Sequence, residues 1–525
     1  MLFVSFGFIL AVAACIWWRR GYRQRTPVWS AHLRGRLLRT AEEAAAILST
    51  AATGPTLQIG RLRFPIRVAG GHFAFVGATG SGKTMLQRLL MQSVLPEVGQ
   101  GRGVRALVYD AKQDVLSILG GMRLRSVVQI LNPLDSRSVA WDMASDITSP
   151  ASALQVATGL IPPSDRDTNP FFTNAARHLL FGVLLHCIQQ AEGRWSFRQV
   201  LLVLRDAELL RRVLGASSET QHLLQYCAHE GTFQNILSTV LTVTSSFEII
   251  AAAWDRAGEK LSLRRWVASE GILMLGNDEM NRAALDTINR LLFQRLSELM
   301  LGQSEVSSGD SRRTWIFLDE VREMGRLEGL PRLLTKGRSK GVSVAIGFQD
   351  VAGLQSVYGR EIAEEVLGQC SSKVILRLNS AGTARWASQL FGSREILERS
   401  RSENRSRSMR NLGFDWSASS GEGVSNGIRK RELVLDSEFL DLPEPTLEAG
   451  LSAYFLSPIT GGFLDRIPGS WMQAKLLPRS RTILDHVPRP EAEQYLRPWS
   501  DEDSLALGLT PDASAPSTVA NRGRR

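Results

Sequence analysis

The sequence predicts an α/β protein with a mainly parallel sheet, helices on both of its faces, and an all-helical domain inserted into the chain. Six short apolar runs predict the strands, at residues 72–77, 104–110, 270–275, 314–320, 342–348 and 373–378. Their near-continuous apolar character, with helical stretches between them, is typical of parallel strands buried on both faces. Between residues 150 and 265 such runs disappear and the apolar residues follow helical spacing, which predicts the all-helical domain.

Length and composition narrow the class of protein. The chain has 525 residues, of which 44% are hydrophobic and 22% charged, so it is long enough for several folded domains and is neither fibrous nor wholly disordered. Its four cysteines are scattered without paired or metal-ligand spacing, which excludes a disulfide scaffold and a zinc ribbon. The net charge of +10 predicts a polyanionic partner, either nucleic acid or an anionic membrane surface.

The first residues predict a membrane anchor. Residues 1–18 carry no charge, and as a helix they would span roughly 27 Å, near the minimum for one crossing. Trp17 and Trp18 stand where an interfacial aromatic belt would lie, and seven arginines follow between residues 19 and 39. Because positive charge stays on the cytoplasmic side, we expect a single-pass membrane protein with most of the chain in the cytoplasm.

Two alternatives compete with the anchor. A cleaved signal peptide would carry its positive charge before the apolar run, whereas here all of it comes after. A lipoprotein-type cleavage site at residues 12–15 would place the rest of the chain outside the cytoplasm, away from the ATP that the downstream motifs require.

The remaining segments differ in composition. We expect a basic, mostly helical linker at residues 19–60, and a sheet domain in two parts, 61–149 and 266–470, on either side of the helical domain. Arginines and a Ser/Gly-rich stretch at 399–431 predict a flexible basic loop. Residues 471–525 are expected to form a C-terminal extension that ends in a disordered tail.

One motif predicts a nucleotide site. Residues 77–84, GATGSGKT, fit the phosphate-loop pattern and lie where it must lie, after a predicted strand and at the start of a predicted helix. The glycines let backbone N–H groups surround the phosphates, while Lys83 reaches the β- and γ-phosphates and Thr84 ligates Mg²⁺. The predicted nucleotide-binding residues are Gly77, Ala78, Thr79, Gly80, Ser81, Gly82, Lys83 and Thr84.

Acidic residues end another predicted strand, as an ATP-hydrolysing site requires. In WIFLDE, Asp319 is expected to help hold Mg²⁺ and Glu320 to orient and polarise the attacking water. Gln349 ends the next strand and is a weaker candidate for contacting the γ-phosphate or the water. Two arginines, Arg338 and Arg377, are candidates for a cation supplied to a neighbouring subunit's nucleotide, although each is as readily an ordinary surface arginine.

Several motifs in order make the chain resemble one known family. The phosphate loop, YDAKQD (109–114), ILNPLDSRSVAWD (130–142), NPFFTNAARHLL (169–180), the stretch 315–350 and QCSSKVILRLNS (369–380) together resemble the TraD-type coupling proteins of conjugative type IV secretion. The resemblance also takes in residues 32–48 and covers roughly residues 30–465.

The resemblance implies a function as well as a fold. It implies a RecA-like motor that carries the helical domain, assembles as a hexameric ring in the inner membrane, and uses ATP and Mg²⁺ to pump single-stranded DNA. Implied partners are the relaxase and other relaxosome proteins and the components of the secretion channel. Such proteins commonly have two N-terminal spans around a small periplasmic domain, whereas one span is found here, so either the anchor is reduced or a first helix is missing.

Two other functions stay open on the sequence alone. One is a related ring motor for double-stranded DNA, and the stretches NPLD and 315–334 favour the conjugative group over it. The other is a nucleotide-gated receptor that docks protein substrates at the secretion channel. Glu320 argues against a pure switch, because a site that only binds nucleotide has no need of an acid that activates water.

Overall fold

The structure is a computed structural model that describes residues 29–51, 54–66, 71–163, 169–307, 311–408 and 417–509. The predicted anchor at residues 1–18 and the end of the predicted tail lie outside the described residues.

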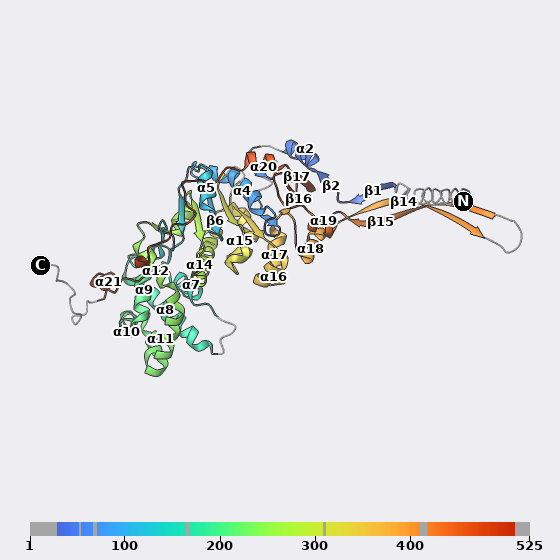
Figure 1. Cartoon of the computed structure of the whole chain (residues 1–525). Coiled ribbons are helices and arrows are strands. Elements are labelled where there is room, and N and C mark those ends of the chain that lie inside the picture. The colour runs from blue at the N-terminus through green and yellow to red at the C-terminus, as the bar shows by residue number, and fades with distance from the viewer. Residues whose placement is uncertain are drawn as a thin grey trace, which may run out of the picture.

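A ten-stranded sheet forms the centre of the molecule (Figure 1). From β13 through β7 all neighbouring strands are parallel, and β16 and β17 extend the sheet in antiparallel fashion. All six predicted strands are confirmed within it. In sheet order the strands are β2 (Leu38–Thr40), β17 (Gly461–Ile467), β16 (Leu451–Ser457), β13 (Ser372–Ile375), β5 (Phe73–Val76), β12 (Val342–Phe348), β11 (Arg313–Leu318), β6 (Val104–Asp110), β10 (Ile272–Gly276) and β7 (Val128–Leu131).

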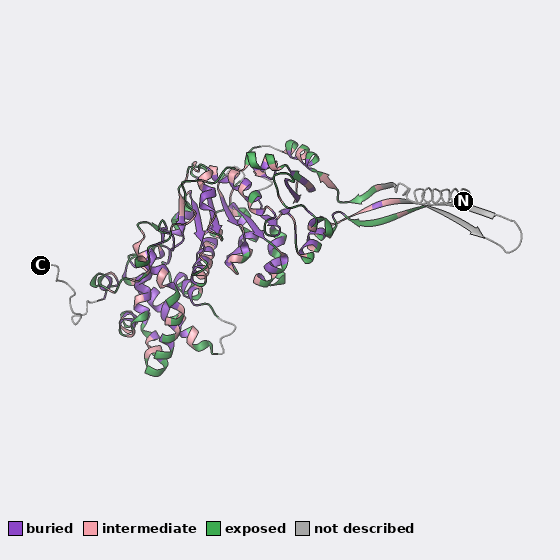
Figure 2. Cartoon of the chain, viewed as in Figure 1, coloured by how far each residue is buried: buried purple, intermediate pink, exposed green. Residues whose placement is uncertain are grey.

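Both faces of the sheet are buried, as the apolar strands predict (Figure 2). Successive side chains of a strand point to opposite faces. Phe73 and Phe75 of β5 therefore belong to the core under α2 (Ala41–Ala51) and α4 (Lys83–Val94). Val76 belongs to the other core, which packs against α14 (Arg282–Leu301) and continues into the helical domain.

Helices predominate in the described residues between 150 and 265, which lie between the two groups of sheet strands. Within residues 150–265 the one strand among the described residues is β9 (Lys260–Leu261), which pairs with β8 (Ala140–Trp141). The principal helices are α7 (Pro150–Leu160), α8 (Pro170–Gln190), α9 (Phe197–Arg205), α10 (Ala207–Gly215), α11 (Glu230–Thr244) and α12 (Glu248–Arg256). By length and composition α8 and the run Glu230–Arg256 could each cross a membrane, but about half of each is buried inside this domain, as expected of core helices.

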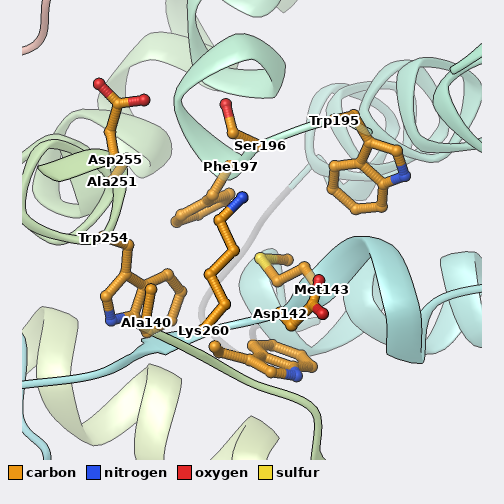
Figure 3. Close-up of a pocket in the computed structure, with 11 residues that line it drawn as sticks. Ala140, Asp142, Met143, Trp195, Ser196, Phe197, Ala251, Trp254, Asp255 and Lys260 are labelled. Carbon is orange, nitrogen blue, oxygen red and sulfur yellow. The ribbon is translucent and has the colours of Figure 1, made fainter. Parts of the chain in front are cut away.

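Aromatic rings fill the junction between the helical domain and the sheet domain (Figure 3). Trp254 of α12 packs edge-on against Trp141 of β8, with ring centroids 6.2 Å apart, and lies 5.9 Å from Phe197 of α9. The cavity left between them is about 40 Å³, room for only a few water molecules. The junction is therefore a packed contact and does not accommodate a nucleotide.

A C-terminal strap, residues 476–509, also joins the two domains. Its Val487 and Arg489 form backbone hydrogen bonds of 2.8 and 3.0 Å with Ser136 and Leu134, and the Arg489 guanidinium donates to the Pro133 carbonyl. The strap thus lies on the ILNPLD stretch, residues 130–135. At its far end α21 (Asp501–Ala506) docks on the helical domain, where buried Arg198 of α9 pairs with Asp503.

Two expectations about local structure are wrong. The helix expected at residues 41–48 is present as α2, but the other described residues of the linker expected at 19–60 are not mostly helical. β1 (Trp29–Gly35) and β2 pair with distant strands, and β3 (Thr56–Ile59) forms a local hairpin with β4 (Leu62–Pro65). The sequence also predicts a flexible loop at 399–431, but the residues described there, 399–408 and 417–431, form strands. They belong to the antiparallel pair β14 (Ser393–Ser408) and β15 (Ser417–Glu432), which projects from the body with β1 on the edge beside β14 (Figure 1).

Ion pairs join the strands at the described base of this strand pair, where Ile396 of β14 is also buried. Arg34 of β1 pairs with Glu395 of β14 at 2.7 Å, and Glu398 of β14 forms ion pairs with Arg429 at 3.1 Å and Arg431 at 3.0 Å. Opposite charges on neighbouring strands stabilise a sheet. Composition alone does not reveal such pairs, which is why the basic, Ser/Gly-rich sequence suggested a loop.

Candidate nucleotide-binding site

The phosphate loop connects β5 to α4 at the carboxyl edge of the sheet. Gly80 and Gly82 have φ angles of 76° and 98°, the left-handed region that side chains disfavour. At Gly82 an added Cβ would also lie 2.3 Å from Leu451, so the position requires glycine. Backbone bonds from Gly77 to Phe348 (3.3 Å) and from Ala78 to Arg377 (2.8 Å) fix the start of the loop against the strands on either side.

Lys83 is the first residue of α4 and is buried. Its ammonium Nζ donates to the carbonyl oxygen of Gly77 at 2.7 Å, so it lies across the loop. Burial lowers the pKa of Lys83, while the carboxylates of Glu320 and Asp319 oppose that effect. The lysine charge is therefore held over the concave loop with two acids nearby.

The two acids follow β11, two strands from β5 in the sheet. Thr84 donates its hydroxyl to Asp319 Oδ2 at 3.0 Å, which joins the start of α4 to the end of β11. Glu320 is buried, and burial raises the pKa of its carboxyl group while Lys83 and a hydrogen bond from Gln349 oppose the rise. The structure thus brings the predicted lysine, threonine and both acids together.

Gln349 bridges the acid and the phosphate loop. Its amide nitrogen donates to Glu320 Oε2 at 3.1 Å, and its amide oxygen accepts the Thr79 hydroxyl at the same distance. A single side chain therefore contacts both the phosphate-binding side of the site and the candidate water-activating acid.

The residues present suit a nucleotide-bound divalent cation. Asp319 Oδ1 is buried and has no hydrogen-bond partner among the described residues, although its other oxygen is satisfied by Thr84. No group of three metal-ligating side chains occurs in the described part of the chain. Mg²⁺ is usually held by one or two protein oxygens together with substrate phosphates, and Thr84 and Asp319 provide such a set.

The two candidate arginines lie at opposite edges of the sheet. Arg377 follows β13 beside the chain's own phosphate loop, and its guanidinium pairs with Glu444. Arg338 belongs to the short helix η5 (Gly337–Lys340) that precedes β12. It is exposed and lines an open cleft of about 620 Å³, roughly 20 Å from its own loop because the whole seven-residue strand intervenes.

Sequence reasoning missed one buried acid at this edge. Asp110 ends β6, which is adjacent to β11, and its carboxylate accepts backbone N–H groups of Lys112, Asp114 and Val115 at 3.1–3.3 Å. Burial raises its pKa to about 6 despite these bonds. The signal was present, because YDAKQD ends an apolar strand with an acid just as WIFLDE does.

Comparison with known proteins places this geometry in context. Residues 56–454 match the family model described as the type IV secretion-system coupling protein DNA-binding domain. The coupling protein TraD of Escherichia coli (strain K12) is 24% identical over 437 residues, which cover 81% of this chain and 56% of TraD. The chain thus spans little more than half the length of that relative.

Solved structures share the fold. The unbound conjugative coupling protein TrwB superimposes with a TM-score of 0.66 at 20% identity, covering 89% of this chain and 98% of that one. TrwB in complex with ADP and Mg²⁺ gives a TM-score of 0.65 at 21% identity, with coverage of 88% and 99%.

Proposed function

Because this chain belongs to the family of type IV secretion-system coupling proteins, we propose that it is a membrane-anchored, ATP-hydrolysing ring motor that moves single-stranded DNA toward the secretion channel. The observation that carries the proposal is the convergence of Lys83, Thr84, Asp319 and Glu320 on one phosphate loop. That TrwB was solved with ADP and Mg²⁺ supports the same ligands here. The relaxosome and the channel are the proposed protein partners.

The proposed chemistry assigns each side chain one task. The loop N–H groups and Lys83 bind the phosphates, and Mg²⁺ held by Thr84 and Asp319 would neutralise charge on the β- and γ-phosphates. Glu320 orients water and accepts its proton, which suits a carboxylate whose pKa burial has raised. Gln349 contacts both Glu320 and Thr79, so it would couple the presence of the γ-phosphate to the position of the Glu320 carboxylate.

Arg338 is the better candidate for a cation that acts on a neighbour. It is exposed, it stands at the edge opposite its own loop, and none of its side-chain nitrogens has a recorded partner among the described residues. Arg377, beside its own loop and paired with Glu444, is placed to act within its own subunit. In a ring the two edges of neighbouring subunits can face each other, so Arg338 of one subunit would approach the nucleotide of the next.

Arg338→Ala is therefore expected to lower kcat about 1,000-fold or more, the usual effect of losing an arginine that stabilises the transition state. Mixing Arg338→Ala with Lys83→Ala subunits should restore part of the activity, because a mixed interface combines an intact loop with an intact arginine. Arg332→Ala, at an exposed arginine of α15 (Gly329–Lys336), is the control. Failure of the mixture to recover any turnover would contradict action between subunits.

DNA binding tests the proposed substrate. The chain carries a net charge of +10, and a pump that accepts any sequence should contact mainly phosphates. The full chain is expected to bind single-stranded oligonucleotides of different sequence with similar Kd values, and log Kd should rise steeply and linearly with log salt concentration. Affinity that does not change with salt, or that follows base sequence, would argue against a channel that tracks the DNA backbone.

The anchor is part of the proposal although it lies outside the described residues. With one uncharged span at residues 1–18 and arginines after it, everything from Arg19 onward should be cytoplasmic. A reporter fused near residue 60 should accordingly behave as cytoplasmic in whole cells. Periplasmic behaviour of that fusion would reverse the topology.

A further inference from the structure

An exposed aromatic cluster marks the start of α8 in the helical domain. Phe171 is the most exposed phenylalanine among the residues that the structure describes, with 47% of its surface open to solvent. Its ring centroid lies 5.3 Å from that of Phe172 and 6.3 Å from that of Tyr226, which lies in turn 5.9 Å from that of His178. Phe171, Phe172, His178 and Tyr226 are called the Phe171 cluster below.

Two elements hold these rings in place. Phe171, Phe172 and His178 occupy the first turns of α8, where the Asn169 side chain accepts the Phe171 N–H at 3.3 Å. Tyr226 belongs to the short helix η2 (Gln221–Cys227), and its hydroxyl is 2.8 Å from His178 Nδ1. The cluster therefore stands on two elements, α8 and η2, that the His178–Tyr226 contact joins.

Packing in the apolar core accounts for the apolar residues that follow in α8, but it does not account for the exposed ring of Phe171. Ala175, Ala176 and Leu179 of the same helix are fully buried. An aromatic group left half in solvent beside other aromatic rings is the kind of surface that marks a binding site.

The surroundings of the cluster favour a flat ligand with polar edges. Burial lowers the pKa of His178, and the neighbouring Arg177 and His222 lower it further, which favours the neutral imidazole. Arg177 of the same helix is already engaged, because its guanidinium donates to the Ile161 carbonyl and to the Asn174 side-chain oxygen, both at 2.8 Å. Asn174 and Gln225 are exposed on the two elements that carry the rings. Flat rings with amide groups on the same elements match the bases of an unpaired nucleic acid strand, which have flat faces and hydrogen-bonding edges.

We propose that the Phe171 cluster is a stacking platform for the bases of single-stranded DNA. The inference rests on the proposed function, because it assumes that the motor engages unpaired DNA. It adds that the helical domain contacts the bases of that DNA. Stacking is indifferent to sequence, since every base has a flat face, so the platform suits a motor that must accept any strand.

Anisotropy titrations of the full chain with an oligothymidylate and with an abasic strand of the same length test this proposal. Phe171→Ala is expected to weaken oligothymidylate binding by about 5- to 150-fold, the range for loss of one base-stacking ring, and to leave abasic binding unchanged. The slope of log Kd against log salt should also stay the same, because no phosphate contact is removed. Phe171→Leu should behave like the alanine variant, whereas Phe171→Trp should restore binding.

Tyr495→Ala is the matched control, since Tyr495 is an exposed aromatic residue of the strap with 66% of its surface open to solvent. If the wild type binds oligothymidylate and Phe171→Ala binds it equally well, the platform is wrong while the proposed function stands. If the wild type binds neither strand, both the platform and the proposed substrate are wrong. A change in subunit assembly on sedimentation, with DNA binding unchanged, would show that the cluster instead contacts a second copy of the chain.

Discussion

Replacing Lys83 with alanine is expected to lower kcat at least about 100-fold, because a charge that acts on the transferring phosphate is lost. The fold should survive. Burial lowers the pKa of Lys83, so its charge does not by itself stabilise the fold. Its ammonium donates to the Gly77 carbonyl and forms no direct ion pair with a carboxylate of the described residues, so the alanine variant does not break a salt bridge there. Steady-state hydrolysis of ATP, with thermal unfolding as the check on folding, measures both effects.

The matched control is Lys475→Ala, at an exposed lysine that ends α20 (Gly469–Lys475). It removes the same charge and the same side chain far from the acids of the site, and its turnover should equal that of the wild type. Near-wild-type hydrolysis by a folded Lys83→Ala protein would mean that the phosphate loop is not the active site.

Glu320→Gln should separate binding from hydrolysis. The amide keeps the shape of the carboxylate and can still pair with Gln349, but it cannot take a proton from water. We expect ATP affinity to stay within a few-fold of the wild type, while hydrolysis falls by about 100-fold or more, the contribution typical of a general base. Measured by nucleotide titration and turnover on the same sample, the variant should trap the ATP-bound protein.

Loss of ATP binding together with turnover would give Glu320 a different role. It would then be a metal ligand or a structural acid, and Asp110, the other buried carboxyl group at this edge, would become the candidate for the proton acceptor. Asp110 is a poor acceptor as it stands, since three backbone N–H groups already occupy its oxygens.

The sheet and the phosphate loop could be predicted from the sequence because their signals are local. A strand such as Val342–Phe348 is buried on both faces, so nearly every residue in it is apolar. The phosphate loop is recognisable because two of its glycines have left-handed backbone angles that residues with side chains rarely adopt. Lys83 and Thr84 follow these glycines at the spacing of the motif.

What could not be predicted depends on distant contacts. β14 and β15 have no apolar alternation, and the pairing of β1 with β14 through Arg34 and Glu395 joins residues 361 positions apart. The docking of the strap could not be predicted either, because it depends on contacts such as the hydrogen bond from Arg489 to the carbonyl of Pro133, far away in the sequence. Nor could the sequence reveal that Arg377 pairs with Glu444 whereas Arg338 is exposed.

Whether DNA drives ATP hydrolysis at this site is tested most directly by the rate of ATP hydrolysis by the full chain with and without single-stranded DNA. We expect slow hydrolysis by the protein alone, a clear increase when single-stranded DNA is added, and no response in Glu320→Gln. Hydrolysis at the same rate with and without DNA, or no hydrolysis by a folded protein that binds ATP, would contradict this expectation.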